Sequence, residues 1–226
     1  MSETCKKKKT LLSWSSGKDS AWTLHVLRQQ PDVETVGLFC TINQEFDRVA
    51  MHSVRMALVL EQARCLGLLV SFVPIPYPCT NADYEKIMAD FIKQAEDDGI
   101  EQIAFGDLFL EDIRQYREDA MQGSSINAIF PLWGKPTEAL SREMVQAGLR
   151  AVITCVDPKK LSGSFAGKIY DESFLNMLPA GIDPCGEYGE FHSFVFDGPM
   201  FHRAVKFNPG ETVKRDGFIF ADLLPD

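Results

Sequence analysis

Ser15-Ser16-Gly17-Lys18-Asp19-Ser20 is a polar stretch between a short apolar run at residues 11–14 and an apolar helical pattern that begins at Ala21. This order predicts a strand, a tight turn and a helix. Such a turn directs backbone N–H groups, the positive end of a helix dipole and a lysine at one point, which favours phosphate oxyanions. The stretch, called here the 15–20 loop, therefore predicts a phosphate site; a serine-rich helix cap that binds nothing is the alternative.

The spacing within the 15–20 loop argues against the commonest class of phosphate-binding loop. A Walker A loop has two glycines with four residues between them, the second directly before Lys-Ser/Thr. The 15–20 loop contains only Gly17, so ordinary P-loop NTPase chemistry is not expected. We also expect Ser16 to have a negative φ, because a positive φ favours glycine.

The composition indicates a globular protein with an acidic surface. A chain of 226 residues that is 45% hydrophobic can bury a core in one large domain, or one and a half. Its net charge of −9 disfavours a broad nucleic-acid surface, and the four lysines at 6–9 indicate a solvated tail. The six cysteines form no C-x-x-C pair, which disfavours metal-cluster and dithiol redox sites. With no signal peptide and no apolar stretch of membrane-spanning length, we expect a cytoplasmic protein without membrane contact.

Strands and helices are predicted to alternate through the first 132 residues. The predicted strands lie at 34–42, 68–75, 102–105 and 128–132, and the predicted helices at 18–29, 53–66, 80–98 and 110–121. This alternation is typical of a parallel sheet covered by helices on both faces, in which ligands bind at the carboxyl ends of the strands. The 15–20 loop, residues 41–46 and Gly106-Asp107 are therefore expected to converge.

The last third of the chain changes character. A helix at 137–147, a strand at 151–156 and a short helix at 171–178 are followed, from Phe191 on, by alternation of period two. Turn signals at 197–199, 208–210 and 216–217 predict antiparallel strands. We predict an α/β fold with an ATP-binding, Rossmann-like parallel-sheet domain at 1–132 and a smaller α+β C-terminal subdomain at 133–226. The interface between the two is the expected cleft.

Gly186-Glu187-Tyr188-Gly189-Glu190 is the second informative stretch. It places two carboxylates three residues apart on a glycine-containing loop. Close carboxylates repel one another unless a cation, an ammonium or hydrogen-bond donors lie between them, so a functional site accounts for the pattern. A solvated acidic turn is the alternative.

Together these motifs resemble a known family. The 15–20 loop is similar to the PP-loop, S-G-G-x-D-S, of the ATP pyrophosphatase superfamily. With Phe105-Gly106-Asp107, Pro131-Leu132-Trp133 and the glutamate loop, the chain resembles the diphthine–ammonia ligase family over nearly its whole length. The resemblance implies an adenine-nucleotide hydrolase-like fold and ATP-dependent conversion of a carboxylate into a carboxamide, with ammonia as nitrogen donor and AMP and pyrophosphate as products.

The sequence departs from the family at two glycines, where it has Ser16 and Tyr188. Bacterial relatives with such variants occur in organisms without the diphthine-bearing elongation factor, and amidation of a corrinoid in vitamin B12 salvage has been proposed for some of them. The resemblance therefore predicts the reaction class, while the acceptor is a diphthine-like side chain, a corrinoid or another small carboxylate.

Each motif residue receives an expected role. The nucleotide is expected to contact the 15–20 loop, Thr41 at the end of the second strand, His52 in the family's nucleotide-binding loop, Gly106 and Asp107; in the loop the residues are Ser15, Ser16, Gly17, Lys18, Asp19 and Ser20. Lys18 and Ser20 would stabilise the pyrophosphate leaving group. Asp19 holds Mg²⁺ or caps the helix, and Asp107 contacts Mg²⁺, orients the ribose or forms a local turn.

The acceptor side of the site is expected on the next helix and the glutamate loop. Arg114 and Arg117 share a helix face and would neutralise phosphates or a substrate carboxylate, or else pair with Glu111 and Glu118. Glu187 and Glu190 would bind ammonium or deprotonate it, because the nucleophile must be neutral NH₃. Gly186, Gly189 and His192 would contact the substrate.

Two other functions were weighed against the amide ligase. A tRNA-modifying sulfur transferase predicts reactive cysteine pairs and a basic surface, and the sequence has neither. A nucleotide sensor without turnover would not require two carboxylates in a glycine loop. The sequence identifies neither the acceptor nor the oligomeric state, and a homo-oligomer stays open.

Overall fold

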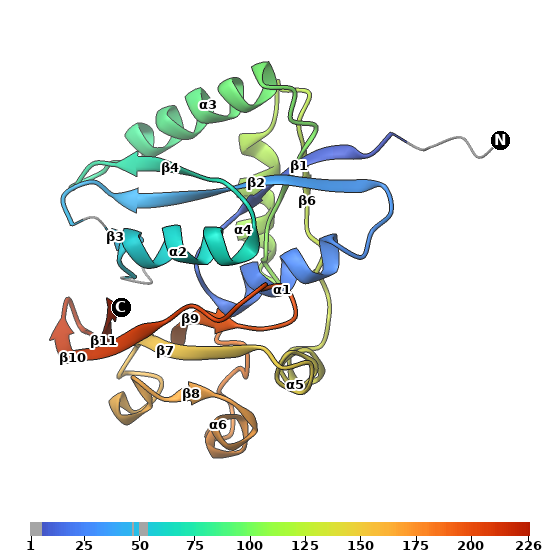
Figure 1. The fold of residues 1–226 in the computed structure, drawn as a ribbon. Helices are drawn as coiled ribbons and strands as arrows, with labels where there is room; N and C mark the ends of the chain where they lie inside the picture. The colour runs from blue at the N-terminus through green and yellow to red at the C-terminus, as the bar shows by residue number, and fades with distance from the viewer. Residues whose placement is uncertain (1–5, 47, 50–53) are drawn as a thin grey trace.

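Two β-sheets with two helices between them form the fold (Figure 1). The computed structural model describes residues 6–46, 48–49 and 54–226. The first sheet, sheet A, contains six strands: β1 (Lys8–Ser13), β2 (Val33–Asn43), β3 (Arg48–Val49), β4 (Val70–Ile75), β5 (Gln102–Ala104) and β6 (Asn127–Ile129).

Sheet A is parallel except at β3. Its order is β3-β2-β1-β5-β6, and β4 also pairs with β2. The parallel pairing of β2, β4, β5 and β6 confirms the α/β prediction. The short β3 was not predicted; it turns back antiparallel on the end of β2 through the pairs Ile42–Val49 and Asn43–Arg48.

Sheet B is antiparallel and belongs to the last third of the chain. It contains β7 (Arg150–Val156), β8 (Ile169–Tyr170), β9 (Phe191–Asp197), β10 (Phe207–Arg215) and β11 (Phe218–Pro225). The predicted turn at 216–217 is present, with φ values of 51° at Asp216 and 85° at Gly217. The predicted turn at 208–210 is wrong: these residues lie inside β10, where the register shifts. Pro209 is tolerated there because β10 is an edge strand and its missing N–H breaks no ladder.

Six α-helices are described: α1 (Lys18–Leu27), α2 (Met56–Leu66), α3 (Asn81–Asp97), α4 (Glu111–Ala120), α5 (Thr137–Gln146) and α6 (Glu172–Met177), with a short 3₁₀ helix at Gly163–Phe165. In Figure 1, α3 lies on the face of sheet A that points away from sheet B, and α1 and α2 lie between the sheets. Helix α5 lies beside the end of β7, and α6 lies beyond β8. The Thr80 hydroxyl accepts the Asp83 N–H at 3.2 Å and so caps the start of α3. None of the described helices combines the length and the apolar character needed to cross a bilayer.

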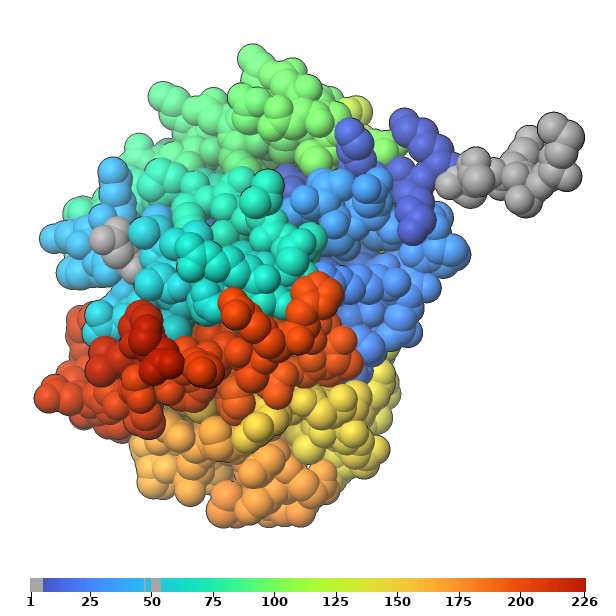
Figure 2. Space-filling view, viewed as in Figure 1, coloured from blue at the N-terminus to red at the C-terminus, as the bar shows by residue number. Residues whose placement is uncertain are grey.

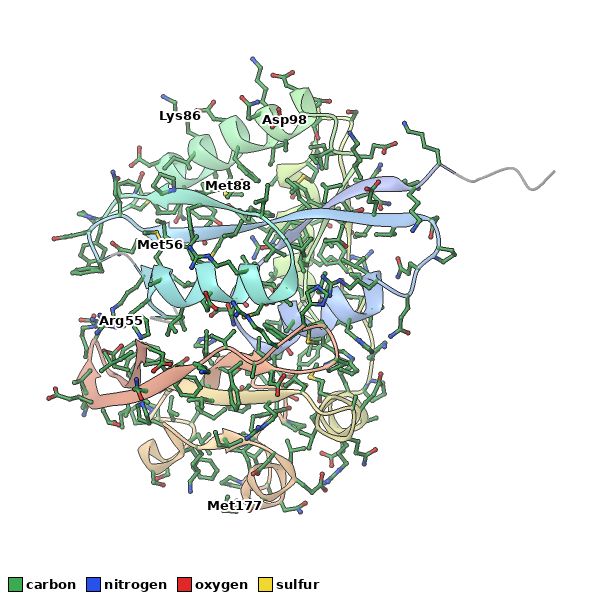
Figure 3. All side chains as sticks on the ribbon, viewed as in Figure 1. Arg55, Met56, Lys86, Met88, Asp98 and Met177 are labelled. Atoms are coloured by element: carbon green, nitrogen blue, oxygen red, sulfur yellow. The ribbon has the colours of Figure 1, made fainter. Side chains whose placement is uncertain are left out.

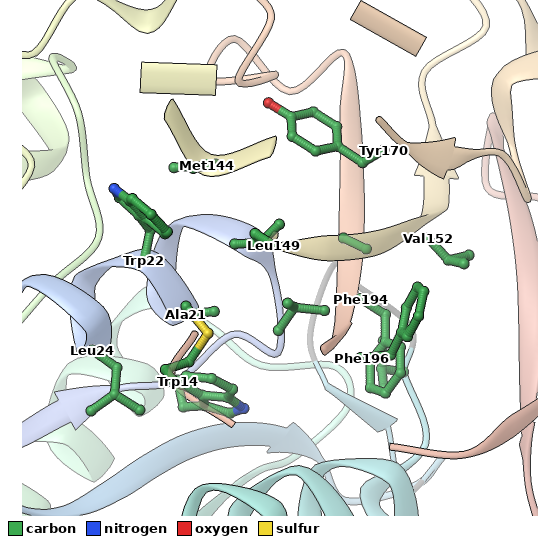
Figure 4. Close-up of a cluster of buried hydrophobic side chains, with 14 of the residues drawn as sticks. Trp14, Ala21, Trp22, Leu24, Met144, Leu149, Val152, Tyr170, Phe194 and Phe196 are labelled. Atoms are coloured by element: carbon green, nitrogen blue, oxygen red, sulfur yellow. The ribbon is translucent and has the colours of Figure 1, made fainter. Parts of the chain in front are cut away.

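Helix α1 is buried because it packs against both sheets. Trp22, Leu24 and Leu27 are at most 1% exposed. Figure 4 shows Trp22 and Leu24 in one apolar cluster with Phe194 and Leu149 from the C-terminal part of the chain. The helix that begins at the 15–20 loop is therefore fixed by side chains from both halves.

Polar contacts also join the two halves. The Gln62 amide on α2 is fully buried; it accepts from Trp14 Nε1 at 2.9 Å and donates to the carbonyl oxygens of Ser16 (3.1 Å) and Val195 (2.6 Å). At the molecular edge, Arg48 and Arg55 both donate to the Asp222 carboxylate on β11, at 2.9 and 2.5 Å.

These ion pairs lie where the two halves meet. Figure 3 shows Arg55 between α2 and the β10–β11 region, and in Figure 2 the C-terminal segment lies directly against α2. The division of the chain at 132/133 stays a prediction.

Candidate active site

The 15–20 loop follows β1 and leads directly into α1, as predicted. Gly17 is the helix N-cap, with extended φ and ψ of −90° and 175°. The first N–H groups of α1 have no partner within the helix and carry the positive end of its dipole. The Ser20 hydroxyl donates to the Gly17 carbonyl at 3.0 Å and lies 3.2 Å from the Ser15 hydroxyl. Two hydroxyls and the helix start thus face the same point.

Ser16 corrects one expectation: its φ is +69°, not negative. The residue is fully buried, and its hydroxyl has no hydrogen-bond partner among the described residues. Its carbonyl oxygen accepts the Val195 N–H at 2.9 Å and the Gln62 amide at 3.1 Å. These two bonds fix the peptide in the left-handed conformation, at a cost of about 1 kcal/mol for a residue other than glycine.

Lys18 connects the 15–20 loop to the C-terminal half. Its side chain is 3% exposed; Nζ lies 2.8 Å from the Asp19 carboxylate and also donates to the Cys185 carbonyl oxygen. Its backbone N–H donates to the Ser193 hydroxyl at 3.2 Å. Burial is the largest single influence and lowers the pKa of the ammonium, but Asp19, Cys185 and Glu187 together raise it, and the pKa lies above its ordinary value. Lys18 is therefore a cation at neutral pH.

Gly106 brings the loop after β5 against the start of α1. A Cβ atom at Gly106 would lie 3.0 Å from the Asp19 carbonyl carbon and 3.1 Å from the Ser20 nitrogen, so only glycine fits without a backbone shift. The next residue, Asp107, is thereby placed beside Asp19. Burial, reinforced by Asp19, raises the pKa of the Asp107 carboxyl, while Arg117 opposes the shift at a Nε–Oδ2 distance of 3.7 Å.

The glutamate loop approaches from the other side. The Glu187 carboxylate accepts the Leu108 N–H at 2.9 Å, which ties this loop to the segment after Asp107. Burial first, and then the Asp19 carboxylate, raise the pKa of Glu187 to about 7. A carboxyl group that titrates near neutrality in a polar cavity is suited to accept and release a proton.

Glu190 has a different position from Glu187. It is 3% exposed, and its Oε1 accepts the Asp183 N–H at 3.1 Å. Asp183 in turn accepts the Glu187 N–H at 2.8 Å. Glu190 therefore supports the loop that carries Glu187 and does not itself line the cavity between the halves.

One cavity of about 260 Å³ brings these groups together. Of the predicted site residues, it is lined by Ser15, Lys18, Asp19, Ser20, Gly106, Asp107, Arg117, Gly186, Glu187, Gly189 and His192. Ser16, Gly17, Thr41, Arg114 and Glu190 do not line it. His52 lies outside the described residues. The loop after the first strand and the glutamate loop thus meet, although 167 residues separate Lys18 from Cys185.

Arg114 turns away from the cavity. Its Nε lies 2.8 Å from Glu118, and its guanidinium lies 4.8 Å from the Trp133 ring and 5.2 Å from the Phe130 ring. The predicted alternative of pairing with Glu118 is thus the observed one. Arg117, one helical turn further, faces the cavity instead.

His192 and Ser193 complete the wall on β9. Burial, together with the Lys18 charge, lowers the pKa of His192 to about 4, so the imidazole is neutral at pH 7. Burial also raises the pKa of the Cys185 thiol, which therefore is not a nucleophile at neutral pH. Ser193 and Asp183 were not predicted; both flank the glutamate loop, but nothing in the sequence marks their partners.

Asp19 and Asp107 in the cavity suit a magnesium–nucleotide complex better than a metal bound by protein alone. Within 6–46, 48–49 and 54–226, no group of three or more His, Cys, Asp or Glu side chains is arranged to hold a metal ion. Asp107 Oδ2 is buried and accepts no hydrogen bond from the described residues. Because Mg²⁺ is often held by one or two carboxylates together with substrate phosphates, Asp19 and Asp107 fit that role.

A serine- and glycine-containing turn between a parallel strand and a buried helix, at the carboxyl edge of sheet A, defines an α/β fold of the PP-loop, Rossmann-like class. The family models "Diphthamide synthase N-terminal domain" and "Diphthamide synthase C-terminal domain" match residues 8–125 and 136–220. The chain belongs to this diphthamide synthase family, which confirms the resemblance found in the motifs.

Proteins with an assigned activity share about a quarter of their aligned residues with this chain. The chain is 25% identical to the diphthine–ammonia ligase of Bos taurus over 184 residues, which cover 77% of this chain and 67% of that one. It is 26% identical to the Homo sapiens enzyme of the same name over 185 residues, with the same coverage. A Schizosaccharomyces pombe protein of that name is 27% identical over 119 residues, 51% of this chain and 20% of the other.

Proposed function

We propose that the protein is an ATP-dependent ligase that adenylates a carboxylate and transfers ammonia to it, releasing AMP and pyrophosphate. One observation carries the proposal: Lys18 at the start of α1 and Glu187 on the C-terminal loop line the same cavity. The first supplies positive charge for phosphates and the second a base for nitrogen. The diphthine–ammonia ligase relatives support this reaction class.

The 15–20 loop holds the phosphate end of ATP. The N-terminal end of α1, the Ser15 and Ser20 hydroxyls and the Lys18 ammonium converge there. The acceptor carboxylate attacks the α-phosphorus, the bond to the bridging oxygen of the β-phosphate breaks, and pyrophosphate leaves. Positive charge and N–H donors at this end stabilise the negative charge that develops on the leaving group.

Asp19 and Asp107 would hold Mg²⁺ together with the phosphates. When bound, the ion neutralises phosphate charge and lowers the mutual repulsion of the two carboxylates. Lys18 stays paired with Asp19 at 2.8 Å and so orients that carboxylate. Arg117 balances the charge of Asp107 from the far side.

Glu187 receives the nitrogen donor. Ammonium is attracted to its carboxylate, which takes one proton and leaves neutral NH₃. The NH₃ attacks the carbonyl carbon of the acyl-adenylate, and AMP leaves with the former carboxylate oxygen, so that an amide remains. A pKa of about 7 leaves Glu187 about half ionised at neutral pH, which suits a group that must both take up and release a proton.

Product analysis tests the proposal. Purified protein with ATP, Mg²⁺, ammonium and a panel of carboxylates should form AMP and pyrophosphate in equal amounts. Lys18→Met should abolish this, while Lys86→Met, which removes an exposed lysine on α3 (Figure 3), should not. ATP binding without AMP formation from any carboxylate would instead identify a nucleotide sensor.

A further inference from the structure

The turn that carries Glu187 also carries an exposed aromatic side chain. Glu187 and Tyr188 are the central residues of a turn closed by the Gly189 N–H and the Gly186 carbonyl at 3.0 Å. Tyr188 is 58% exposed, a large exposure for an aromatic residue beside a buried carboxylate.

A second segment runs alongside this turn and contacts it twice. Leu108 donates its N–H to the Glu187 carboxylate, and the ring of the next residue, Phe109, lies 5.2 Å from the Tyr188 ring at an angle of 60°. The position of Tyr188 is thus set by the same contacts that set Glu187. Phe109 is half-buried, so its ring and that of Tyr188 form an apolar ledge next to the candidate base.

The ledge borders an open cavity of about 490 Å³ that is distinct from the nucleotide cavity. Phe109, Lys135 and Tyr188 line it and are called here the Tyr188 shelf. Among the described residues, no carboxylate lies within ion-pair distance of the Lys135 ammonium. Asp183 also lines the cavity, and its carboxylate accepts the Glu187 N–H at 2.8 Å. The shelf therefore offers two aromatic faces and one lysine that forms no ion pair with the described residues.

We propose that the Tyr188 shelf binds the acceptor, a small molecule with a flat apolar body and a second anionic group besides the carboxylate that reacts. The proposal rests on the proposed function, because only a ligase of this kind needs a carboxylate acceptor beside Glu187. Aromatic rings stack on flat apolar groups, and a lysine without a partner attracts an anion. The volume suits a small molecule.

Tyr188 is then a specificity-determining residue rather than a catalytic one. It selects acceptors through the flat body, Lys135 selects them through the second anionic group, and Glu187 acts on nitrogen in the adjoining cavity. A glycine at position 188 would remove the aromatic face and leave the base in place.

Binding of simple carboxylates tests the shelf without requiring turnover. The probes are homophthalate, which has a ring and two carboxylates, phenylacetate, which lacks the second carboxylate, and glutarate, which lacks the ring. Saturation-transfer and chemical-shift NMR titrations would measure their affinities with and without Mg-ATP. Homophthalate should bind more tightly than either of the others, and Mg-ATP should not displace it.

Variants then assign the contacts. Tyr188→Ala should weaken homophthalate about fivefold, while Tyr188→Phe should bind as the wild type does, since it keeps the ring. Lys135→Met should weaken homophthalate to the affinity of phenylacetate. The matched control is Tyr77→Ala, because Tyr77 is 62% exposed and does not line the shelf cavity.

Several outcomes would overturn the shelf: no saturable homophthalate binding, displacement by Mg-ATP, no effect of Tyr188→Ala, or a loss in Tyr77→Ala instead. Failure of the shelf and failure of the ligase are distinguishable. If AMP forms but Tyr188→Ala binds homophthalate as the wild type does, only the proposal of the shelf is wrong. If binding depends on Tyr188 but no carboxylate yields AMP, the shelf stands as a binding site and the ligase is wrong.

Discussion

Shifting the pH between 6 and 8 at constant total ammonium tests whether Glu187 is the base for the nitrogen donor. With a pKa of about 7, raised by burial and by Asp19, the carboxyl is about one tenth ionised at pH 6, one half at pH 7 and nine tenths at pH 8. If bound ammonium gives its proton to Glu187, the rate follows the ionised form of Glu187. It should rise about tenfold from pH 6 to pH 8 and then level off.

The assay is the initial rate of AMP release at saturating Mg-ATP, at constant ionic strength and with a carboxylate that the protein accepts. Glu187→Gln cannot take up the proton, and it should lower the rate by a factor on the order of 10² to 10⁴. Glu85→Gln, an exposed position on α3, is the matched control. It should leave both the rate and the pH profile unchanged.

The alternative source of nucleophile gives a different profile. If neutral NH₃ arrives from solution, the rate follows the NH₃ fraction, which rises about tenfold per pH unit well below the pKa of ammonium (~9) and is still rising at pH 8. That result, or a Glu187→Gln variant with the wild-type profile, would refute the role of Glu187 as a base.

Three further substitutions test the scaffold of the site. Gly106→Ala places a Cβ 3.0 Å from the backbone of α1, so the melting temperature should fall by an amount equivalent to about 1–3 kcal/mol, and ATP should no longer raise it in a thermal-shift assay. Ser16→Gly removes the strain of a positive φ on a residue with a Cβ, and it also removes an unpartnered buried hydroxyl. It should raise the urea midpoint by an amount equivalent to about 1 kcal/mol. A lower midpoint would contradict this. Asp222→Asn removes the acceptor of Arg55 and Arg48, which lower the pKa of Asp222 to about 2 against the effect of burial. The lowered pKa of Asp222 stabilises the fold above the unfolded-state pKa near pH 4, and this contribution is lost as the pH falls towards 2. In denaturant melts the variant should therefore be about 1–2 kcal/mol less stable than the wild type at pH 7, and the difference between the two should become small at pH 2.

Local pattern was enough to predict the elements of sheet A other than β3, and the position of the 15–20 loop. Apolar runs of strand length, the helix cap at Thr80 and the strand-end rule for parallel sheets depend on neighbours within a few residues. That Lys18 and Glu187 line one cavity agrees with the resemblance, which implied that the phosphate loop and the glutamate loop serve one active site. In these parts of the molecule, the local sequence pattern and the tertiary contacts favour the same structure.

Two features of the site depend on contacts that the local sequence pattern does not show. Ser16 has a positive φ because Gln62 and Val195, 46 and 179 residues away, both bond to its carbonyl oxygen. Glu190 reads like Glu187 in sequence, yet it is turned inward to support the loop through Asp183. No local pattern distinguishes a supporting carboxylate from a reactive one.

Helix α1, enclosed by both sheets, makes the phosphate loop dependent on the whole chain. If the gene were cut between codons 132 and 133, the N-terminal fragment would carry the loop but leave Trp22 and Leu24 without their covering strands. We expect neither fragment to bind nucleotide alone, and we expect co-expression of the two fragments to restore nucleotide binding. In such a split protein, nucleotide binding would show that the two fragments have reassembled.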